Sequence, residues 1–300
     1  MNRIAVLGST GQLGNDLVEV LQSSNVFEVL PLNHAAMECT KHDSVRTVLK
    51  KAGPQVVINC AAFVRVDECE DRPEKALEVN ALGALHVART CAEIDALCVH
   101  ISTDYVFDGS KGSAYTESDT PCPINVYGAS KLAGEQLVRR SAPRWLIVRM
   151  ASLFGKTGAR GKGGNFIETI IAKARAGEPL RVVNDVRMSP TYTYDAAQAL
   201  VQILQSNATG LLHLTNQGAC TWYEFAREAL ELIGLGAAIE PIDSIEYPTK
   251  ARRPRNSSLE SERLNGLLKC RTRSWREAVK AYLVEKAYIP SVTLPATILS

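Results

Sequence analysis

The chain has 300 residues, of which 46% are hydrophobic and 22% charged, and its formal net charge is +2. This balance is typical of a soluble globular protein and gives no electrostatic reason to expect nucleic acid or a membrane surface as a partner. No apolar run reaches the ~18 residues of a spanning helix, and the first residues lack the pattern of a signal peptide, so we expect a cytoplasmic protein. The eight cysteines form no Cys-x-x-Cys pair, and we expect neither a disulfide framework nor a metal site.

The first half of the chain alternates short apolar runs with longer amphipathic stretches. Strands are expected over 3–7, 28–32, 56–59, 98–102 and 145–149, and helices over 13–22, 44–51, 73–94 and 127–140. This alternation predicts an α/β fold with a Rossmann-type, doubly wound parallel sheet. The strands are continuous apolar runs, as strands covered on both faces should be.

The pattern is looser after about residue 150. A glycine-rich stretch over 155–164 predicts a mobile loop. Further helices are expected over 165–177, over 195–205 and from Thr221, which has Glu224 at capping-box spacing, with a strand over 210–215. We expect a dinucleotide-binding domain from residues 1–150 plus about 191–215. A smaller C-terminal α/β substrate domain would take about 151–190 plus 216–300, with the last ten residues as a loosely held tail.

A glycine-rich turn directly follows the first expected strand. Gly8, Gly11 and Gly14 are spaced Gly-x-x-Gly-x-x-Gly and lead into a helix. In this position, glycines permit a tight turn and a close approach of the backbone to a pyrophosphate, and the helix N-terminus favours phosphate. A strand–helix turn without a ligand is the alternative. The expected cofactor contacts here are Gly8, Thr10, Gly11, Gln12, Leu13 and Gly14.

The sequence leaves the choice between NADH and NADPH open. The second strand ends at Asn33, where an acidic residue would favour NAD and a nearby arginine would favour NADP. Glu38 is near enough to contact the adenosine half of a cofactor, and Lys41 is placed to approach a 2′-phosphate. After the third strand, small residues allow either a close cofactor or ordinary tight packing. The expected contacts from these two regions are Asn33, Glu38, Cys39, Ala61, Ala62 and Phe63.

Two separate segments of the sequence together contain the residues expected in a proton-transfer site. The first is the segment from Ser102 to Gly109, which includes Thr103, and the second holds the pair Tyr127 and Lys131. Residues four apart share a helix face, and a neighbouring ammonium lowers the pKa of a phenol. A surface tyrosine and lysine that meet by chance are the alternative, and this motif alone does not decide between them.

In this order and spacing, the segments resemble the extended short-chain dehydrogenase/reductase family, and more narrowly the dTDP-4-dehydrorhamnose reductase family. Further segments at 164–166, 189–191, 222–226 and 253–257 extend the resemblance over nearly the whole chain. It implies reduction of the C4 ketone of a nucleotide-activated 6-deoxy sugar by NADPH or NADH, with dTDP-4-dehydrorhamnose giving dTDP-L-rhamnose as the leading reaction. It also admits a homodimer.

The resemblance implies a role for each matching residue. Tyr127 would donate the proton, Lys131 would hold the nicotinamide ribose and keep the phenol acidic, and Thr103 would hydrogen-bond the reacting oxygen. Ser102, Tyr127 and Lys131 would also contact the cofactor. The expected substrate contacts are Thr103, Asp104, Val66, Ser152, Asn165 and Arg253.

Two further groups of residues have open interpretations. Asn80 would either act on Lys131 through water or pack its helix. The basic segment Lys250, Arg252, Arg253 and Arg255 suits a substrate diphosphate or is a solvated loop.

Several residues depart from the family pattern, and they leave the identity of the sugar substrate undecided. Ser152 stands where an aromatic wall is expected, Val64 stands where a threonine is usual, and the residues before Ser189, including Met188, differ as well. One alternative is a non-catalytic regulatory subunit that binds a nicotinamide nucleotide, which the intact Thr103 and Tyr127 argue against. The other is a different nucleotide-sugar reductase or epimerase of the same superfamily.

Overall fold

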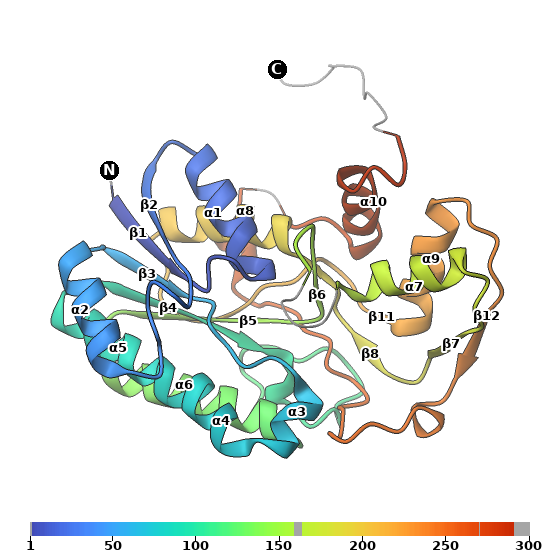
Figure 1. The fold of residues 1–300 in the computed structure, drawn as a ribbon, viewed down its shortest axis with the longest axis horizontal. Coiled ribbons are helices and arrows are strands. Elements are labelled where there is room, and N and C mark those ends of the chain that lie inside the picture. The colour runs from blue at the N-terminus through green and yellow to red at the C-terminus, as the bar shows by residue number, and fades with distance from the viewer. Residues whose placement is uncertain (1, 159–163, 270, 291–300) are drawn as a thin grey trace.

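The computed structural model describes residues 2–158, 164–269 and 271–290, and its centre is a six-stranded parallel sheet (Figure 1). The spatial order of the strands is β10-β5-β4-β3-β1-β2. Their bounds are β1 (Asn2–Leu7), β2 (Phe27–Leu32), β3 (Val56–Asn59), β4 (Leu97–Thr103), β5 (Trp145–Met150) and β10 (Gly210–His213). From β1 the chain adds β2 on one side, and it then returns to add β3 on the other side of β1. The strand order therefore reverses between β1 and β3, and such sheets bind ligands at this point.

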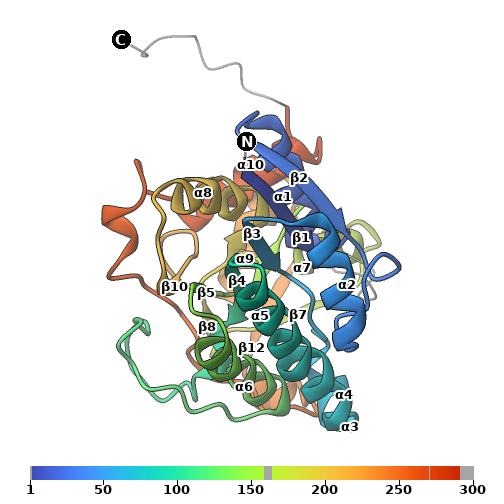
Figure 2. The same cartoon turned by 90° about the vertical axis from the view of Figure 1, so that its left-hand side faces the viewer.

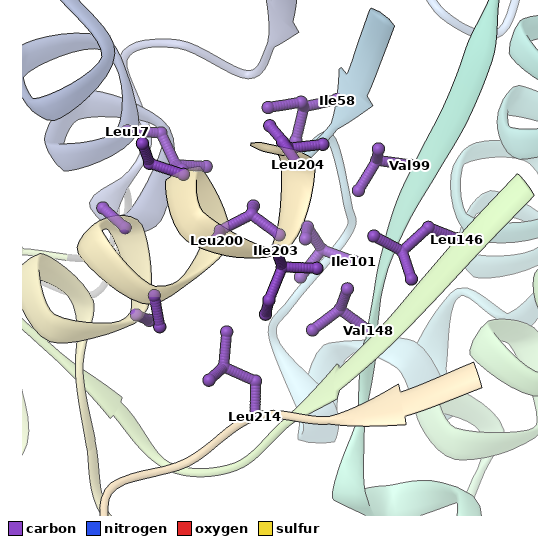
Figure 3. Packing of buried hydrophobic residues seen from close by; sticks show 14 of the residues in the cluster. Leu17, Ile58, Val99, Ile101, Leu146, Val148, Leu200, Ile203, Leu204 and Leu214 are labelled. Carbon is purple, nitrogen blue, oxygen red and sulfur yellow. The ribbon is translucent and has the colours of Figure 1, made fainter. Parts of the chain in front are cut away.

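Helices cover both faces of this sheet (Figure 2). One face packs on α1 (Gln12–Ser23) and α8 (Thr193–Gln205), and the other on α2 (His42–Ala52), α5 (Gly83–Glu93) and α6 (Val126–Ser141). Figure 3 shows Leu200 and Ile203 of α8 facing strand residues such as Ile101. Successive strand residues alternate between the two cores, since Ile4 and Val6 belong to the first and Ala5 and Leu7 to the second. The predicted Rossmann-type fold is confirmed.

The single helix expected over 73–94 is interrupted. The chain forms α3 (Val66–Asp71) and α4 (Pro73–Leu77), then a π-helical turn (Glu78–Leu82), before α5 begins. A Cβ at Gly134 on α6 would overlap the Asn80 carbonyl oxygen, so α6 approaches this turn as closely as backbone allows. The π turn bonds i to i+5 instead of i to i+4, but it covers only five residues, too few to display a changed apolar period in the sequence.

The C-terminal half builds a second core beside the sheet. Three helices surround it, α7 (Phe166–Arg175), α9 (Trp222–Leu232) and α10 (Trp275–Glu285), with aromatic residues such as Phe225 and Trp275 inside. Asn165 caps α7, and the predicted cap at Thr221 is present, where Thr221 forms the capping box with Glu224. Short paired strands complete this half: β6 (Leu153–Phe154) with β9 (Thr191–Tyr192), β7 (Leu180–Val183) with β12 (Ile239–Ile242), and β8 (Arg187–Met188) with β11 (Cys220–Thr221).

The predicted domain boundaries stay a prediction, although α8 and β10 do pack with the central sheet. Half of the expected glycine loop, over 159–163, and the expected tail, over 291–300, lie outside the described residues. Three short 3₁₀ turns, Asp104–Val106, Ser244–Glu246 and Leu264–Gly266, complete the described secondary structure. Within the described ranges, no helix is long and apolar enough to cross a membrane.

Candidate active site

A cavity of about 1430 Å³ opens at the carboxyl ends of the central strands. Leu7, Cys60, Thr103 and Met150, each at or just after the end of β1, β3, β4 or β5, line it, and it continues to Trp222 in the C-terminal half. This is the edge at which open parallel sheets hold their ligands. One cavity therefore joins the glycine turn, the tyrosine–lysine pair and the C-terminal core.

The glycine turn forms one end of the cavity. Gly8 has φ +70°, a conformation that favours glycine, and a Cβ at Gly14 would overlap the Gly8 carbonyl oxygen. No side chain caps α1 at Gly11, which leaves N–H groups of the first helical turn free for an anion. All six predicted turn residues, Gly8, Thr10, Gly11, Gln12, Leu13 and Gly14, line the cavity.

The region after β2 also lines this end, with Asn33, Glu38 and Cys39 all present in the wall. The basic side chains here already have partners: His34 Nε2 lies 3.3 Å from a Glu38 oxygen, and Lys75 Nζ lies 2.9 Å from a Glu78 oxygen. Lys41, which precedes α2, is not among the lining residues. The geometry therefore leaves the choice between NADH and NADPH open.

Phe63 differs from its predicted neighbours. Ala61 and Ala62 line the cavity, but Phe63 does not. Its backbone N–H donates to Asn80 Oδ1 at 2.8 Å, and its carbonyl accepts from Asn80 Nδ2 at 3.1 Å. Asn80 Nδ2 also donates to Ser130 Oγ on α6, at 2.9 Å. The Asn80 side chain thus ties the segment after β3 to α6, which fits the packing interpretation rather than a contact with Lys131.

Helix α6 brings Tyr127 to Thr103. Asn125 caps the helix by accepting the Gly128 N–H at 2.8 Å. A Cβ at Gly128 would overlap the Tyr105 carbonyl oxygen, so only glycine lets α6 approach the turn after β4 this closely. Tyr127 and Thr103, which are 24 residues apart in the sequence, are consequently hydrogen-bonded through their side chains.

In the protein alone, the pKa of the Tyr127 phenol is raised, and the expected effect of Lys131 on it stays a prediction for the site with its cofactor. Burial raises the pKa of Tyr127 well above its ordinary value of 10, and the hydrogen bond with Thr103 offsets this only in part. The Lys131 ammonium points elsewhere: Nζ donates to the Ile101 carbonyl at 2.6 Å and lies 3.5 Å from His100 Nε2. Burial lowers the pKa of Lys131 from 10.5 to about 8, although the Glu135 carboxylate acts in the opposite direction.

Asp104 is buried beside this pair. Only 3% of the residue is exposed, and the Thr103 hydroxyl donates to its Oδ1 at 2.9 Å while accepting the Tyr105 N–H at 3.2 Å. Asp104 Oδ2 has no hydrogen-bond partner. Burial raises the pKa of this carboxyl from 3.8 to about 6, with Ser257 and Thr103 acting in the other direction.

Asp104→Asn should therefore stabilise the protein above pH 6. Because the pKa is raised on folding, an ionised Asp104 carboxyl destabilises the folded state. This destabilisation is absent below the unfolded pKa of 3.8 and complete above about pH 6. At about 1.4 kcal/mol for each pKa unit, the variant should gain about 3 kcal/mol at pH 8 and nothing at pH 3.5. Urea unfolding at the two pH values measures this, and an equal difference at both would contradict the assignment.

The predicted substrate residues line the opposite part of the cavity. Val66, Ser152, Asn165 and Arg253 all belong to its wall, together with Val64, and Ser152 adopts φ +44°. The side chains of two of these residues, Asn165 and Arg253, already form hydrogen bonds within the protein. Asn165 Nδ2 donates to the Gly155 carbonyl at 3.1 Å and to the Tyr282 hydroxyl at 2.9 Å.

Arg253 and Met188 also have partners away from the cavity. Arg253 Nη2 donates to Asp67 Oδ2 at 2.8 Å. Met188 is buried in the C-terminal core and is not among the lining residues, so its departure from the family pattern does not alter the cavity wall.

A family model described as the RmlD substrate binding domain matches residues 1–288. The chain belongs to this family. It is 39% identical to the spore coat polysaccharide biosynthesis protein SpsK of Bacillus subtilis, over 96% of this chain and 99% of that protein. It is 33% identical to a dTDP-4-dehydrorhamnose reductase of Aggregatibacter actinomycetemcomitans, over 93% and 98% of the two chains. The crystal structure of the Bacillus anthracis dTDP-4-dehydrorhamnose reductase in complex with NADP superposes with a TM-score of 0.89, at 34% identity, over 95% of this chain and 100% of that one.

These likenesses confirm the predicted family and, at the level of the family, the predicted class of nucleotide-sugar ketoreductase. They do not test the individual residues. The roles of Thr103, Tyr127 and Lys131 in this RmlD-family protein therefore stay predictions.

The sequence analysis missed Lys173, a basic residue of the cavity wall, and named Arg252 only as part of the basic segment. Lys173 and Arg252 both line the wall, both are exposed, and neither has a partner among the described residues. Lys173 follows Asn165 and Thr169 at intervals of four on α7, and all three line the cavity, so this helical spacing was the available signal. Of the other basic residues in the 250–255 segment, Lys250 pairs with Asp71 and Arg255 lies outside the wall.

Proposed function

We propose that this protein reduces the C4 ketone of a dTDP-activated 4-keto-6-deoxy sugar with NADPH or NADH, most nearly dTDP-4-dehydrorhamnose to dTDP-L-rhamnose. The observation that carries the proposal is the single cavity in which the glycine turn, Lys131, Tyr127 and Thr103 lie together. The glycine turn suits the pyrophosphate of a dinucleotide, because Gly14 lies close to the Gly8 backbone and no side chain caps the first turn of α1.

The cofactor would be held along the strand ends. The residues Gly8 to Gly14 receive the pyrophosphate, Asn33, Glu38 and Cys39 lie on the adenosine side, and Ala61 and Ala62 flank the middle. Ser102 and Lys131 lie on the nicotinamide side. When bound, the nicotinamide supplies the hydride. The Lys131 ammonium, anchored on Ile101 and positively charged below about pH 8, is placed to bind a ribose hydroxyl.

Tyr127 would be the proton donor. Its raised pKa keeps the phenol protonated at neutral pH, which suits an acid that must protonate an oxygen as negative charge develops there. Thr103, hydrogen-bonded to the phenol, fixes the position of that oxygen.

A panel of nucleotide sugars tests the function. The purified protein should consume NADPH or NADH, followed at its near-ultraviolet absorbance, with a dTDP-4-keto-6-deoxy sugar and more slowly with UDP or GDP counterparts. Cofactor binding without consumption on any sugar would favour the regulatory-subunit alternative. Conversion of the sugar without net loss of the cofactor would favour an epimerase.

The substrate diphosphate should bind at Arg252. This guanidinium lines the cavity and has no carboxylate partner among the described residues, whereas Arg253 is held by Asp67. A charge-assisted hydrogen bond to phosphate contributes about 1.5–3 kcal/mol, less where it is exposed, so Arg252→Ala should raise KM for the nucleotide sugar about tenfold with little change in kcat. Arg255→Ala, outside the cavity wall, is the matched control. An equal rise in KM in both variants would refute the specific role.

We place the protein in the cytoplasm, because all seven cysteines that the structure describes are free, as is usual in a reducing compartment. Assembly as a homodimer stays a prediction, which sedimentation equilibrium would test.

A further inference from the structure

Two buried polar side chains that do not line the cavity stand in a row with Lys131. Asn59 at the end of β3 and His100 in β4 are 2% and 1% exposed. Asn59 Nδ2 lies 3.5 Å from His100 Nδ1, and His100 Nε2 lies 3.5 Å from Lys131 Nζ. A Cβ at Gly134 on α6 would come within 3.3 Å of His100 Nε2, so this glycine leaves space for the imidazole beside the helix. The imidazole therefore connects the end of β3 to the lysine of the cavity.

Asn59 determines which nitrogen of the His100 ring carries the proton. Asn59 Oδ1 accepts the Ala61 N–H at 3.1 Å, so the amide presents its Nδ2 donor to the ring. Burial, together with the nearby Lys131 ammonium, holds the pKa of His100 well below 6.5, and the neutral ring has one donor and one acceptor nitrogen. Because Nδ1 accepts from Asn59, the ring proton resides on Nε2, the nitrogen that faces Lys131.

A donor at His100 Nε2 suits a neutral amine at Lys131 better than an ammonium. An ammonium has three protons and no lone pair, whereas a neutral amine has a lone pair that can accept from Nε2. In both states Nζ can donate to the Ile101 carbonyl, which lies at 2.6 Å. With the ammonium, two donors face each other across 3.5 Å, either at Lys131 or, if the ring proton moves to Nδ1, at Asn59. The Asn59–His100 pair therefore favours loss of the Lys131 proton.

The other ionisable groups around Lys131 add one opposing charge. Glu135, four residues further along α6, favours the ammonium, although its carboxylate is also bonded to Arg149 on β5. Burial raises the pKa of the Cys60 thiol, after β3, and that of the Tyr127 phenol on α6, so neither carries a charge at neutral pH. Burial of Lys131 outweighs Glu135 and lowers the lysine pKa to about 8.

We propose that Asn59 and His100 are positioning residues that present an N–H donor to Lys131 and so limit how firmly the lysine holds its proton. This inference rests on the proposed function, in which the Lys131 ammonium binds the nicotinamide ribose. The pair acts in the same direction as burial and opposes Glu135. It thereby sets the upper pH limit of turnover, because the ammonium is present below about pH 8 and is lost above it.

Titration of the lysine itself tests the inference without any turnover. In protein labelled with ¹³C at lysine Cε, the NMR resonance of Lys131, assigned by its absence in Lys131→Met, should titrate near pH 8. His100→Gln should raise this midpoint by about one unit, a tenfold gain in proton affinity, because the carboxamide oxygen can turn to accept from the ammonium. Asn59→Ala should raise it as well, because the ring is then free to carry its proton on Nδ1.

Cys98→Ala is the matched control. Cys98 lies two residues before His100 on the same face of β4, is 1% exposed, and does not line the cavity. Its truncation loosens the packing of that face without changing the donors at Lys131, so the wild-type midpoint should be kept. An equal rise in Cys98→Ala would assign the shift to looser packing. That result, or an unchanged midpoint in both His100→Gln and Asn59→Ala, overturns the inference.

The pH profile of kcat/KM extends the test to the reaction. The alkaline limb should move upward in His100→Gln by the same amount as the Lys131 resonance. A limb that stays in place while the resonance moves would overturn the link between the lysine charge and turnover. Failure of the proposed function is distinct, because the wild-type protein would then consume no cofactor with any nucleotide sugar, while the NMR titration would still show whether the pair acts on Lys131. Circular dichroism of each variant excludes misfolding as the cause.

Discussion

Tyr127→Phe should lower kcat about 10³-fold and leave cofactor affinity unchanged. A positioned general acid contributes typically 10²–10⁴-fold, and Tyr127 is the acid that the cavity wall places beside Thr103. The ring itself remains, so the packing of α6 against the turn after β4 should be preserved.

Stopped-flow measurement of cofactor oxidation gives kcat, and a fluorescence titration gives the affinity for the cofactor. Tyr115→Phe is the control, because Tyr115 donates its hydroxyl to Asp108 at 2.8 Å and does not line the cavity wall. Turnover in Tyr127→Phe within tenfold of the wild-type rate would remove Tyr127 from the mechanism.

The parts of the fold that could be predicted are those with a local cause. Strand Asn2–Leu7 is an apolar run that ends in Gly8, and the turn and helix after it follow from glycine geometry. The Thr221 and Glu224 capping box likewise needs only residues three apart. The strands of two residues in the C-terminal half have no such signal, since two residues display no alternation.

The pKa values of the site residues could not be predicted from the sequence, because they depend on how deeply each side chain is buried and on where its charged group points. The sequence places Tyr127 and Lys131 on one face of a helix, but it does not show that the ammonium turns toward the Ile101 carbonyl. It also does not show that Asp104 lies buried with an oxygen unpaired. Both facts arise from the packing of α6 against β4, elements that are separated in the sequence, and both change the sign or size of a pKa.

Glu135→Gln should destabilise the protein by about 3–5 kcal/mol, because it would leave Arg149 as an unpaired charge in the interior. Glu135 on α6 and Arg149 on β5 are 0% and 1% exposed, and two hydrogen bonds of 2.8 and 2.7 Å join them. Arg149 Nη1 already lacks a partner, and the guanidinium lies 5.1 Å from the Phe107 ring centre. Urea unfolding at pH 7 measures the loss. Glu93→Gln, which breaks an exposed pair with Arg46, should change little.

The double variant Glu135→Leu with Arg149→Met separates the two roles of this pair. Removing both charges should recover most of the stability lost in Glu135→Gln, since replacing a buried ion pair by apolar residues is often neutral or stabilising. Activity should not recover with it. Glu135 raises the pKa of Lys131 and accepts the Ser102 hydroxyl at 2.6 Å, so the double variant should lose activity at a lower pH on the alkaline side than the wild type, whose Lys131 titrates near 8. A stable double variant with an unchanged alkaline limb would show that the pair holds α6 to the sheet and has no part in keeping Lys131 charged.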